Sequence, residues 1–265
     1  MRVIITRPER EAVKWAAALT DTGYDAVVLP LIDVAPSPDA QSLEQVWQRL
    51  GDYDAVMFVS SNAVEHFFAS KGAVAHVFIA GNAIKTRAFA PGPGTVAALL
   101  RAKVDATCID APGHDSPQFD SEALWAVVGP RVRAGFKVLI VRGMGAAGDA
   151  RSGNGQGRDW FACQVLAAGG AVDYVVAYQR VAVRLHGADL ELARAAASDG
   201  AVWMFSSSEA IGNLAASCPG QDWQQARAVV THPRIGDAAR QAGFGTVLES
   251  RPSLASLLAS IESLQ

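Results

Sequence analysis

The chain has 265 residues, of which 50% are hydrophobic and 18% charged, so it can bury a sizeable core in one or two domains. Its formal net charge of -3 argues against the broad basic surface that nucleic-acid binding needs. No run approaches the roughly 18 consecutive apolar residues of a membrane span, and Met1 leads directly into a strand-like segment instead of a signal peptide. We therefore expect a globular, cytoplasmic protein that binds neither nucleic acid nor membrane.

The spacing of cysteines and histidines argues against a metal site or a disulfide framework. Cys108, Cys163 and Cys218 lie far apart and form no CxxC pair, so core packing is their expected role. The five histidines show no HxxxH or HExxH spacing. We predict that no metal is bound.

The first predicted unit is a strand, a helix and a second strand. Residues 3–6 form an apolar strand, Arg7 follows it, a helix extends to Leu19, and the next strand covers residues 26–30. The same order recurs later, with a strand at 138–141, Arg142, a helix at 160–166 and a strand at 172–178.

Two further pairs of segments recur in the same order. Residues 54–64 and 201–211 are both apolar strands that enter a serine-rich helix start, and helix 92–100 is matched by 232–239. Each half then closes with a strand and a helix, at 106–109 and 121–128 in one and at 246–248 and 253–261 in the other. Short apolar strands that alternate with helices indicate parallel sheets covered on both faces. The sequence therefore predicts an internally duplicated α/β protein with two doubly wound, parallel-sheet domains.

Two extended segments suggest that one domain is interrupted by the other. Residues 31–38 and 174–182 read as connectors at equivalent places of the two halves. We therefore predict one discontinuous domain, residues 1–34 with 178–265, and a second domain, residues 37–175.

Polar residues follow the predicted strands at three kinds of position. Ser60, Ser61 and Asn62, and likewise Ser206, Ser207 and Ser208, stand where a strand passes into a helix. Their side chains can simply cap the helix, but free amides and the helix dipole there also attract carboxylates. We predict two such anion sites, one in each domain, that face a common cleft.

The third helix start and two arginines extend this set. Gly94 and Thr95 open a helix with a predicted threonine cap, and the second half has Pro233 and Arg234 there, with more cationic character. Arg7 and Arg142 each leave a first strand, where the ligand crevice of an open α/β sheet lies. Arginine suits bidentate carboxylate binding, although a solvated surface arginine is the plain alternative.

A glycine motif and a tyrosine complete the candidates. Residues 143–148 match GxGxxG after a strand, but the polar, glycine-rich run that follows disfavours a dinucleotide-binding helix. We read residues 143–158 as a mobile loop over a cleft.

Tyr178 follows an apolar strand, where a buried ring is the plain reading. The sequence has no Ser-His-Asp order, no paired carboxylates at helical spacing and no phosphate loop.

Taken in order, these motifs resemble uroporphyrinogen-III synthases along essentially the whole chain. The matching motifs are Ile5-Thr6-Arg7-Pro8, Phe58-Val59-Ser60-Ser61-Asn62, Pro93-Gly94-Thr95, Val141-Arg142-Gly143, Ala177-Tyr178-Gln179-Arg180, Phe205-Ser206-Ser207-Ser208 and His232-Pro233-Arg234-Ile235. His232 and Arg234 stand where many members of that family have glycine and a hydroxyl residue, so the second anion site is expected either to be altered or to use Arg234 instead.

The resemblance implies two α/β domains joined by a two-stranded connector, and a cyclising lyase that acts as a monomer without cofactor or metal. The implied reaction closes hydroxymethylbilane, a linear tetrapyrrole with eight carboxylates, to uroporphyrinogen III with ring D inverted through a spiro intermediate. Tyr178 matches the family tyrosine implicated in departure of the leaving hydroxyl. Ser60, Ser61, Thr95, Ser206 and Ser207 match positions in the family's cleft.

Two other classes stay open at this stage. One is a non-catalytic ligand-binding or regulatory protein on the same scaffold. The other is a nicotinamide or flavin oxidoreductase, which predicts a helix that starts near Gly148.

Overall fold

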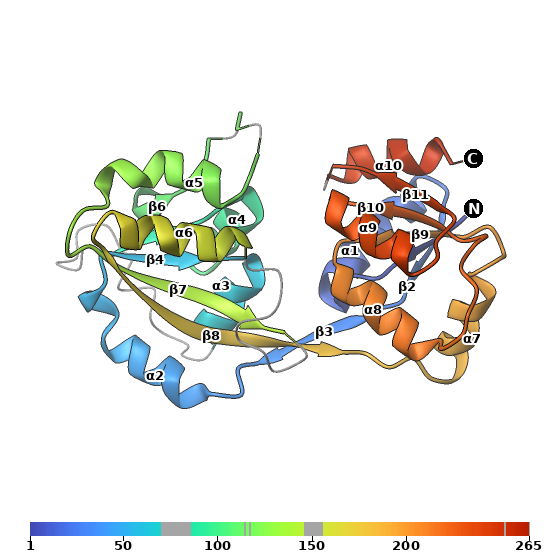
Figure 1. The fold of residues 1–265 in the computed structure, drawn as a ribbon, viewed down its shortest axis with the longest axis horizontal. Helices are drawn as coiled ribbons and strands as arrows, with labels where there is room; N and C mark the ends of the chain where they lie inside the picture. The colour runs from blue at the N-terminus through green and yellow to red at the C-terminus, as the bar shows by residue number, and fades with distance from the viewer. Residues whose placement is uncertain (70–85, 114, 117, 146–155, 252, 265) are drawn as a thin grey trace. The chain divides into compact units, whose positions relative to one another are not determined.

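The computed structural model describes residues 1–69, 86–113, 115–116, 118–145, 156–251 and 253–264. The chain divides into two compact units, Met1–Asp33 with Val181–Gln265 (unit 1) and Val34–Arg180 (unit 2), which Figure 1 colours along the sequence. It passes between the units within β3 (Ile32–Pro36) and within β8 (Ala171–Ala182). These two strands are neighbours in one sheet, so the predicted two-stranded connector is confirmed.

Unit 1 is a five-stranded sheet in the order β11-β10-β9-β1-β2, in which all pairings are parallel. The strands are β1 (Arg2–Ile5), β2 (Asp25–Val28), β9 (Val202–Phe205), β10 (Arg227–Val230) and β11 (Thr246–Glu249). Alternate residues of the central strands face opposite layers, so Ile5 packs with α1 (Glu9–Asp21) and α10 (Leu254–Glu262). Ile4 packs with the layer of α7 (Gly187–Ala195), α8 (Ser208–Ser217) and α9 (Pro233–Gln241).

Unit 2 is a six-stranded sheet in the order β3-β8-β7-β4-β5-β6 (Figure 1). Its other strands are β4 (Ala55–Phe58), β5 (Arg87–Phe89), β6 (Ile109–Asp110) and β7 (Lys137–Met144). One face packs against α2 (Ala40–Gln48), α3 (Ser61–Ala69) and α4 (Pro93–Arg101). The other face packs against α5 (Ser121–Val128) and α6 (Gln156–Ala167). Three short 3-10 segments, η1 (Leu50–Asp52), η3 (Ala106–Cys108) and η4 (Gly129–Arg131), complete the described part.

The two sheets have the same strand order, which confirms the internal duplication. Read from one edge, β6-β5-β4-β7-β8 of unit 2 corresponds to β11-β10-β9-β1-β2 of unit 1. The helix layers correspond as well, because α5 and α6 take the places of α10 and α1. In each sheet the strand order reverses at one place, between β1 and β9 or between β7 and β4. Open α/β sheets bind ligands outside the carboxyl ends of the strands at this switch point.

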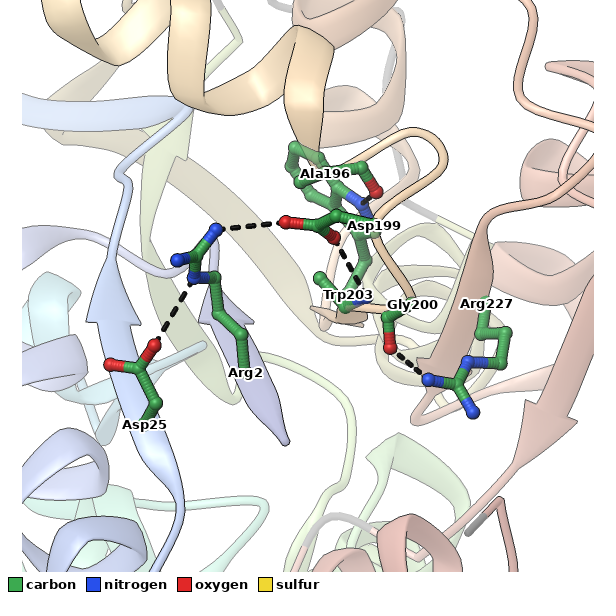
Figure 2. A network of polar contacts seen from close by, with 8 residues as sticks. Arg2, Asp25, Ala196, Asp199, Gly200, Trp203 and Arg227 are labelled. Atoms are coloured by element: carbon green, nitrogen blue, oxygen red, sulfur yellow. Dashed lines mark hydrogen bonds and ion pairs between the residues drawn. The ribbon is translucent and has the colours of Figure 1, made fainter.

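The amino ends of the strands in unit 1 are occupied by structural contacts. Figure 2 shows Arg2, whose guanidinium lies 3.2 Å from Asp25 and 2.8 Å from Asp199. Trp203 Nε1 donates to the carbonyl of Ala196 at 3.1 Å, and Arg227 donates to the carbonyl of Gly200. These polar groups therefore tie β1, β2, β9 and β10 together at the edge of the sheet opposite the switch point.

Several expectations about local structure were wrong. The strand predicted at 106–109 is mostly η3, because the Asp105 side chain accepts a hydrogen bond from Thr107 N–H at 2.8 Å and starts a turn. The loop predicted at 143–158 is too long at both ends, since Gly143 and Met144 continue β7 and residues 156–158 belong to α6. Residues 146–155, including Gly148, lie outside the described part of the chain. Cys163 is exposed, so it does not pack in the core.

Among the α-helices and strands that the structure describes, α2, β5, α7 and β10 were not predicted, nor were the 3-10 segments η1 and η4. Among the helices that the structure describes, none is long and apolar enough to cross a membrane.

Candidate functional site

In unit 2, the switch point brings together Ser60 and Tyr178. Ser60 follows the buried strand β4 and precedes α3. Its Oγ accepts a hydrogen bond from Ala63 N–H at 3.2 Å, so it caps the first turn of the helix as predicted. The same oxygen lies 3.2 Å from Tyr178 Oη. The helix start and the tyrosine hydroxyl therefore form one polar cluster, which we call the Ser60–Tyr178 pair.

Tyr178 reaches this position because of an irregularity in the sheet. β7 and β8 pair in register up to Arg142 with Val176, and then Gly143 pairs with Tyr178, so Ala177 is the additional residue. Such a bulge re-aims the next side chain. Ala177 and Tyr178 consequently both pack in the layer of α2, α3 and α4, although they are consecutive. Tyr178 lies inside β8, which continues past the predicted strand end to Ala182, and its ring is buried, with 4% of its surface exposed, as the plain reading expects.

His66 is a neighbour of Tyr178 that the sequence reading missed. The two ring centroids are 5.7 Å apart, with an angle of 30° between the ring planes. His66 lies three residues after Ala63 on α3, so helical spacing puts both on one side of the helix. The three-residue spacing of Ala63 and His66 is the feature of the sequence that could have pointed to His66. It does so only when the bulge in β8, which places Tyr178 beside α3, is already known.

The remaining predicted residues of unit 2 lie on three elements. Ser61 and Asn62 form the first turn of α3. Gly94 lies in the first turn of α4, where an added Cβ would meet nothing within 4 Å. Thr95 does not cap this helix, because the N-cap is Gly92, and the Thr95 side chain is 6% exposed and lies inside the first turn. Since Gly92 makes no side-chain cap, the start of α4 offers backbone amides and little side-chain chemistry.

Arg142 does not join the Ser60–Tyr178 pair. It lies within β7 and does not leave it, because the strand continues past the bulge to Met144. It alternates with Val141, which packs toward α3, and therefore points to the other face. Its guanidinium lies 4.6 Å from the centre of the Tyr174 ring. This contact holds the cation against an aromatic face.

In unit 1, the equivalent edge carries Arg7, Ser206 and Ser207. Ser207 is the N-cap of α8 and accepts a hydrogen bond from Glu209 N–H at 3.2 Å, and Ser208 is the first residue of that helix. Ser206 and Arg7 line a small pocket, whose other lining residues are Met204, Phe205, Thr231 and Leu257.

Arg7 contacts two side chains of α1. Its Nη1 lies 3.2 Å from a carboxylate oxygen of Glu11, and its Cζ lies 4.5 Å from the centre of the Trp15 ring. Part of its charge is therefore balanced by α1. Arg7 and Arg142 hold equivalent places in the duplication, and each rests on an aromatic ring.

His232 and Arg234 form the third helix start of unit 1. His232 is the N-cap of α9, and its Nδ1 accepts a hydrogen bond from Arg234 N–H at 3.1 Å. Pro233 occupies the first helical position, which suits its fixed backbone angle. The imidazole thus takes the capping role that a hydroxyl residue usually has, and the Arg234 side chain is exposed.

No group of three or more histidine, cysteine or acidic side chains that could hold a metal ion occurs among the residues that the structure describes. The candidate residues of each unit, taken separately, are hydroxyl groups, helix-terminal amides, one histidine and one or two arginines.

Comparisons with known proteins agree with this architecture. Residues 13–259 match the family model of uroporphyrinogen-III synthase HemD. The fold is similar to that of a uroporphyrinogen-III synthetase from Helicobacter pylori, with a TM-score of 0.59, 13% identity and full coverage of both chains, 100% each. It is also similar to a mutant uroporphyrinogen III synthase from the bacterium Thermus thermophilus, with a TM-score of 0.56, 13% identity and coverage of 100% of this chain and 98% of that one. Because the family model matches nearly the whole chain, the protein belongs to the uroporphyrinogen-III synthase family, the cyclising lyases of tetrapyrrole biosynthesis.

Proposed function

We propose that this chain closes hydroxymethylbilane to uroporphyrinogen III with inversion of ring D, and that Tyr178 is the catalytic residue. The observation that supports the assignment is the Ser60–Tyr178 pair. A tyrosine hydroxyl lies 3.2 Å from the serine that caps a helix, at the carboxyl edge of a parallel sheet. Such edges are where open α/β sheets bind ligands.

In the proposed reaction, Tyr178 donates its proton to the hydroxyl of the terminal hydroxymethyl group. The C–O bond breaks, water leaves, and an azafulvene cation is formed. The substituted carbon of ring D attacks this cation and gives a spiro intermediate. The bond from ring D to its original bridging carbon then breaks, that carbon bonds to the unsubstituted carbon of ring D, and the proton there is lost, so the macrocycle closes with ring D inverted. Proton donation by a positioned side chain typically contributes about 100- to 10,000-fold. The bilane cyclises unaided to the isomer that is not inverted, so most of the protein's contribution lies in conformational control.

Tyr178 is buried and hydrogen-bonded, which suits a group that must donate in one direction. Ser60 Oγ already accepts from Ala63 N–H, so its own proton is available for Tyr178 Oη. In that arrangement the Tyr178 proton is free for the substrate. A chain of donors that starts at a helix N-terminus strengthens the last donor, because each bond polarises the next.

The eight carboxylates of the substrate fit the other predicted residues. Backbone amides at the starts of α3, α4 and α8 and the exposed Arg234 supply donors, together with Arg7 beside Ser206. We propose that Ser61, Asn62, Gly94 and Thr95 of unit 2 and Ser208 and Pro233 of unit 1 also bind groups of the substrate, and that Arg142 does so from the opposite face of the unit 2 sheet. Dispersed amides and hydroxyls bind anions without the strong basic field that would retain the product.

We further propose that the predicted domains, residues 1–34 with 178–265 and residues 37–175, act on one substrate molecule. The protein is proposed to work as a monomer in the cytoplasm.

The test supplies hydroxymethylbilane, made freshly by its own synthase, and separates the oxidised uroporphyrin isomers by chromatography. The wild-type protein is expected to shift the product from isomer I to isomer III. Tyr178→Phe is expected to reduce the rate by about 100-fold, the lower end of the range for proton donation, without abolishing it. Tyr174→Phe is the matched control, since it removes a hydroxyl from the same strand and keeps the ring under Arg142.

Isomer I alone, from folded wild-type protein, would instead support a non-catalytic ligand-binding or regulatory role. An unchanged rate in Tyr178→Phe would remove Tyr178 from the catalytic role while leaving the activity in place.

A further inference from the structure

Gly143 stands directly beneath the ring of Tyr178. A Cβ added at Gly143 would lie 2.8 Å from Tyr178 Oη and closer still to Cζ and Cε2 of the same ring. Real Cβ atoms essentially never come that near to another heavy atom. The tyrosine ring therefore occupies the volume that any other residue at position 143 would need.

The backbone at Gly143 gives no other reason for a glycine. Its φ lies outside the left-handed region, whereas Gly135 and Gly169, at φ 82° and φ 80°, do need that freedom. Gly143 lies in β7, where a glycine costs strand stability because it packs nothing. The three atoms nearest to an added Cβ all belong to the Tyr178 side chain, so its close approach is what requires a glycine here.

Three features act together on the tyrosine. The bulge opposite Arg142 and Gly143 turns Tyr178 toward α3, the missing side chain at Gly143 lets its ring lie across β7, and Ser60 meets the hydroxyl at 3.2 Å. From this geometry we infer that Gly143 is a positioning residue, which sets the place of the Tyr178 hydroxyl in the reaction. The inference deepens the proposed function and rests on it for its catalytic consequence.

An alanine at position 143 would move the ring but need not unfold the sheet. The three nearest obstructing atoms are at the far end of a side chain, and the φ of Gly143 lies outside the left-handed region that alanine avoids. Restoring ordinary carbon contact requires a shift of about 1 Å or more. A displacement of that size misplaces a reacting group enough to cost about 10- to 100-fold in rate.

The first experiment needs no substrate, so it remains informative even if the proposed function fails. The protein is labelled with tyrosine carrying carbon-13 at Cζ, and the Tyr178 signal is identified by its loss in Tyr178→Phe. Gly143→Ala is expected to shift the Tyr178 signal and to leave that of Tyr24, in unit 1, in place. Gly113→Ala is the control, since a Cβ there meets nothing within 4 Å and should change neither signal. An unmoved Tyr178 signal in Gly143→Ala would overturn the inference.

The second experiment separates positioning from a structural role by a double-mutant cycle. Gly143→Ala is expected to lose about as much cyclisation rate as Tyr178→Phe, and the double variant is expected to lose little more than either. Losses that multiply would show that Gly143 acts by another route. If Gly143→Ala fails to fold, adding Tyr178→Ala removes the obstructing ring and should restore the fold. A double variant that stays unfolded would equally refute the inference.

Discussion

Ser60 and Ser207 hold equivalent places in the two units, and each caps a helix by accepting one backbone N–H. Ser60 also has a tyrosine hydroxyl as a second neighbour. The duplication therefore provides an internal comparison, in which both serines cap a helix and Ser60 in addition contacts the proposed catalytic group.

Replacing either serine with alanine tests this difference. Ser60→Ala and Ser207→Ala should each lower the free energy of unfolding by about 1 kcal/mol, which is the usual cost of losing an N-cap. Urea unfolding measures this loss. Only Ser60→Ala should also shift the carbon-13 signal of Tyr178 Cζ. A shift of equal size in Ser207→Ala would show that the signal responds to general destabilisation.

A second residue-scale prediction concerns Tyr53, at the amino end of β4. Its hydroxyl donates to Asp173 at 2.8 Å. Burial, followed by the hydrogen bond and the charge of Asp173, raises the pKa of Tyr53 from 10.0 to about 12. Because the folded state holds this proton more tightly, the stabilisation is complete below pH 10 and is lost as the pH rises through about 12.

Ultraviolet titration of tyrosinate checks this prediction, with Tyr53→Phe used to identify the component. Asp173→Asn should move the component to lower pH, since it removes the carboxylate charge. No movement in Asp173→Asn would mean that burial alone raises the pKa.

At the residue scale, the sequence predicts capping better than it predicts contacts. Serine after a strand and before a helix is a local signal, and Ser60 and Ser207 followed it. Thr95 did not, because Gly92 begins the helix three residues earlier. The Ser60–Tyr178 contact depends on a β-bulge at Ala177. The residue types in 174–178 do not predict that Ala177 is unpaired.

Among the elements, the short strand β6 depends on one buried carboxylate. Asp110 is 6% exposed and receives hydrogen bonds from Arg87 on β5 and from Arg131 in η4. The hydrogen bond with Asp110 raises the pKa of the Arg87 guanidinium above its usual value. These contacts fix the last strand of the unit 2 sheet, which has only two residues in its ladder.

Asp110→Ala should therefore destabilise unit 2 by about 2–4 kcal/mol, because it leaves the part-buried Arg87 without its carboxylate. Arg131→Ala should cost less than about 1 kcal/mol, since that side chain is 51% exposed and its attraction is screened by water. Denaturant unfolding of both variants gives the comparison. Equal losses would contradict the view that burial decides the outcome.

Element types were predicted where the apolar pattern was strong. The predicted helix at 121–128 is α5, and the predicted strands in β1, β4 and β9 lie inside their sheets, with every residue but Arg2 buried. Strand β10 and helix α7 were missed, because a short apolar run and an alanine-rich segment are ambiguous without their neighbours.

For the molecule as a whole, each unit has its own hydrophobic core on both faces of its sheet. The clusters of unit 2 lie entirely within residues 34–180, and those of unit 1 lie entirely outside that range. We therefore expect the fragment Val34–Arg180 to fold alone, with cooperative unfolding and dispersed amide signals, and to leave hydroxymethylbilane unconverted to isomer III. A fragment without a cooperative transition would show that unit 2 needs the rest of the chain.

The interrupted connectivity also governs the order in which the protein can assemble on the ribosome. Strand β1 is made long before its neighbour β9, and because β9 pairs Met204 with Ile5, synthesis must advance by about 200 residues before that ladder closes. Unit 2 emerges complete in the meantime and can fold, while the edge of β1 that later pairs with β9 is still unpaired. An exposed apolar edge of that kind invites pairing with other chains. Slow synthesis or crowded polysomes should consequently favour aggregation through Arg2–Ile5, a hazard created by chain order and absent from the finished fold.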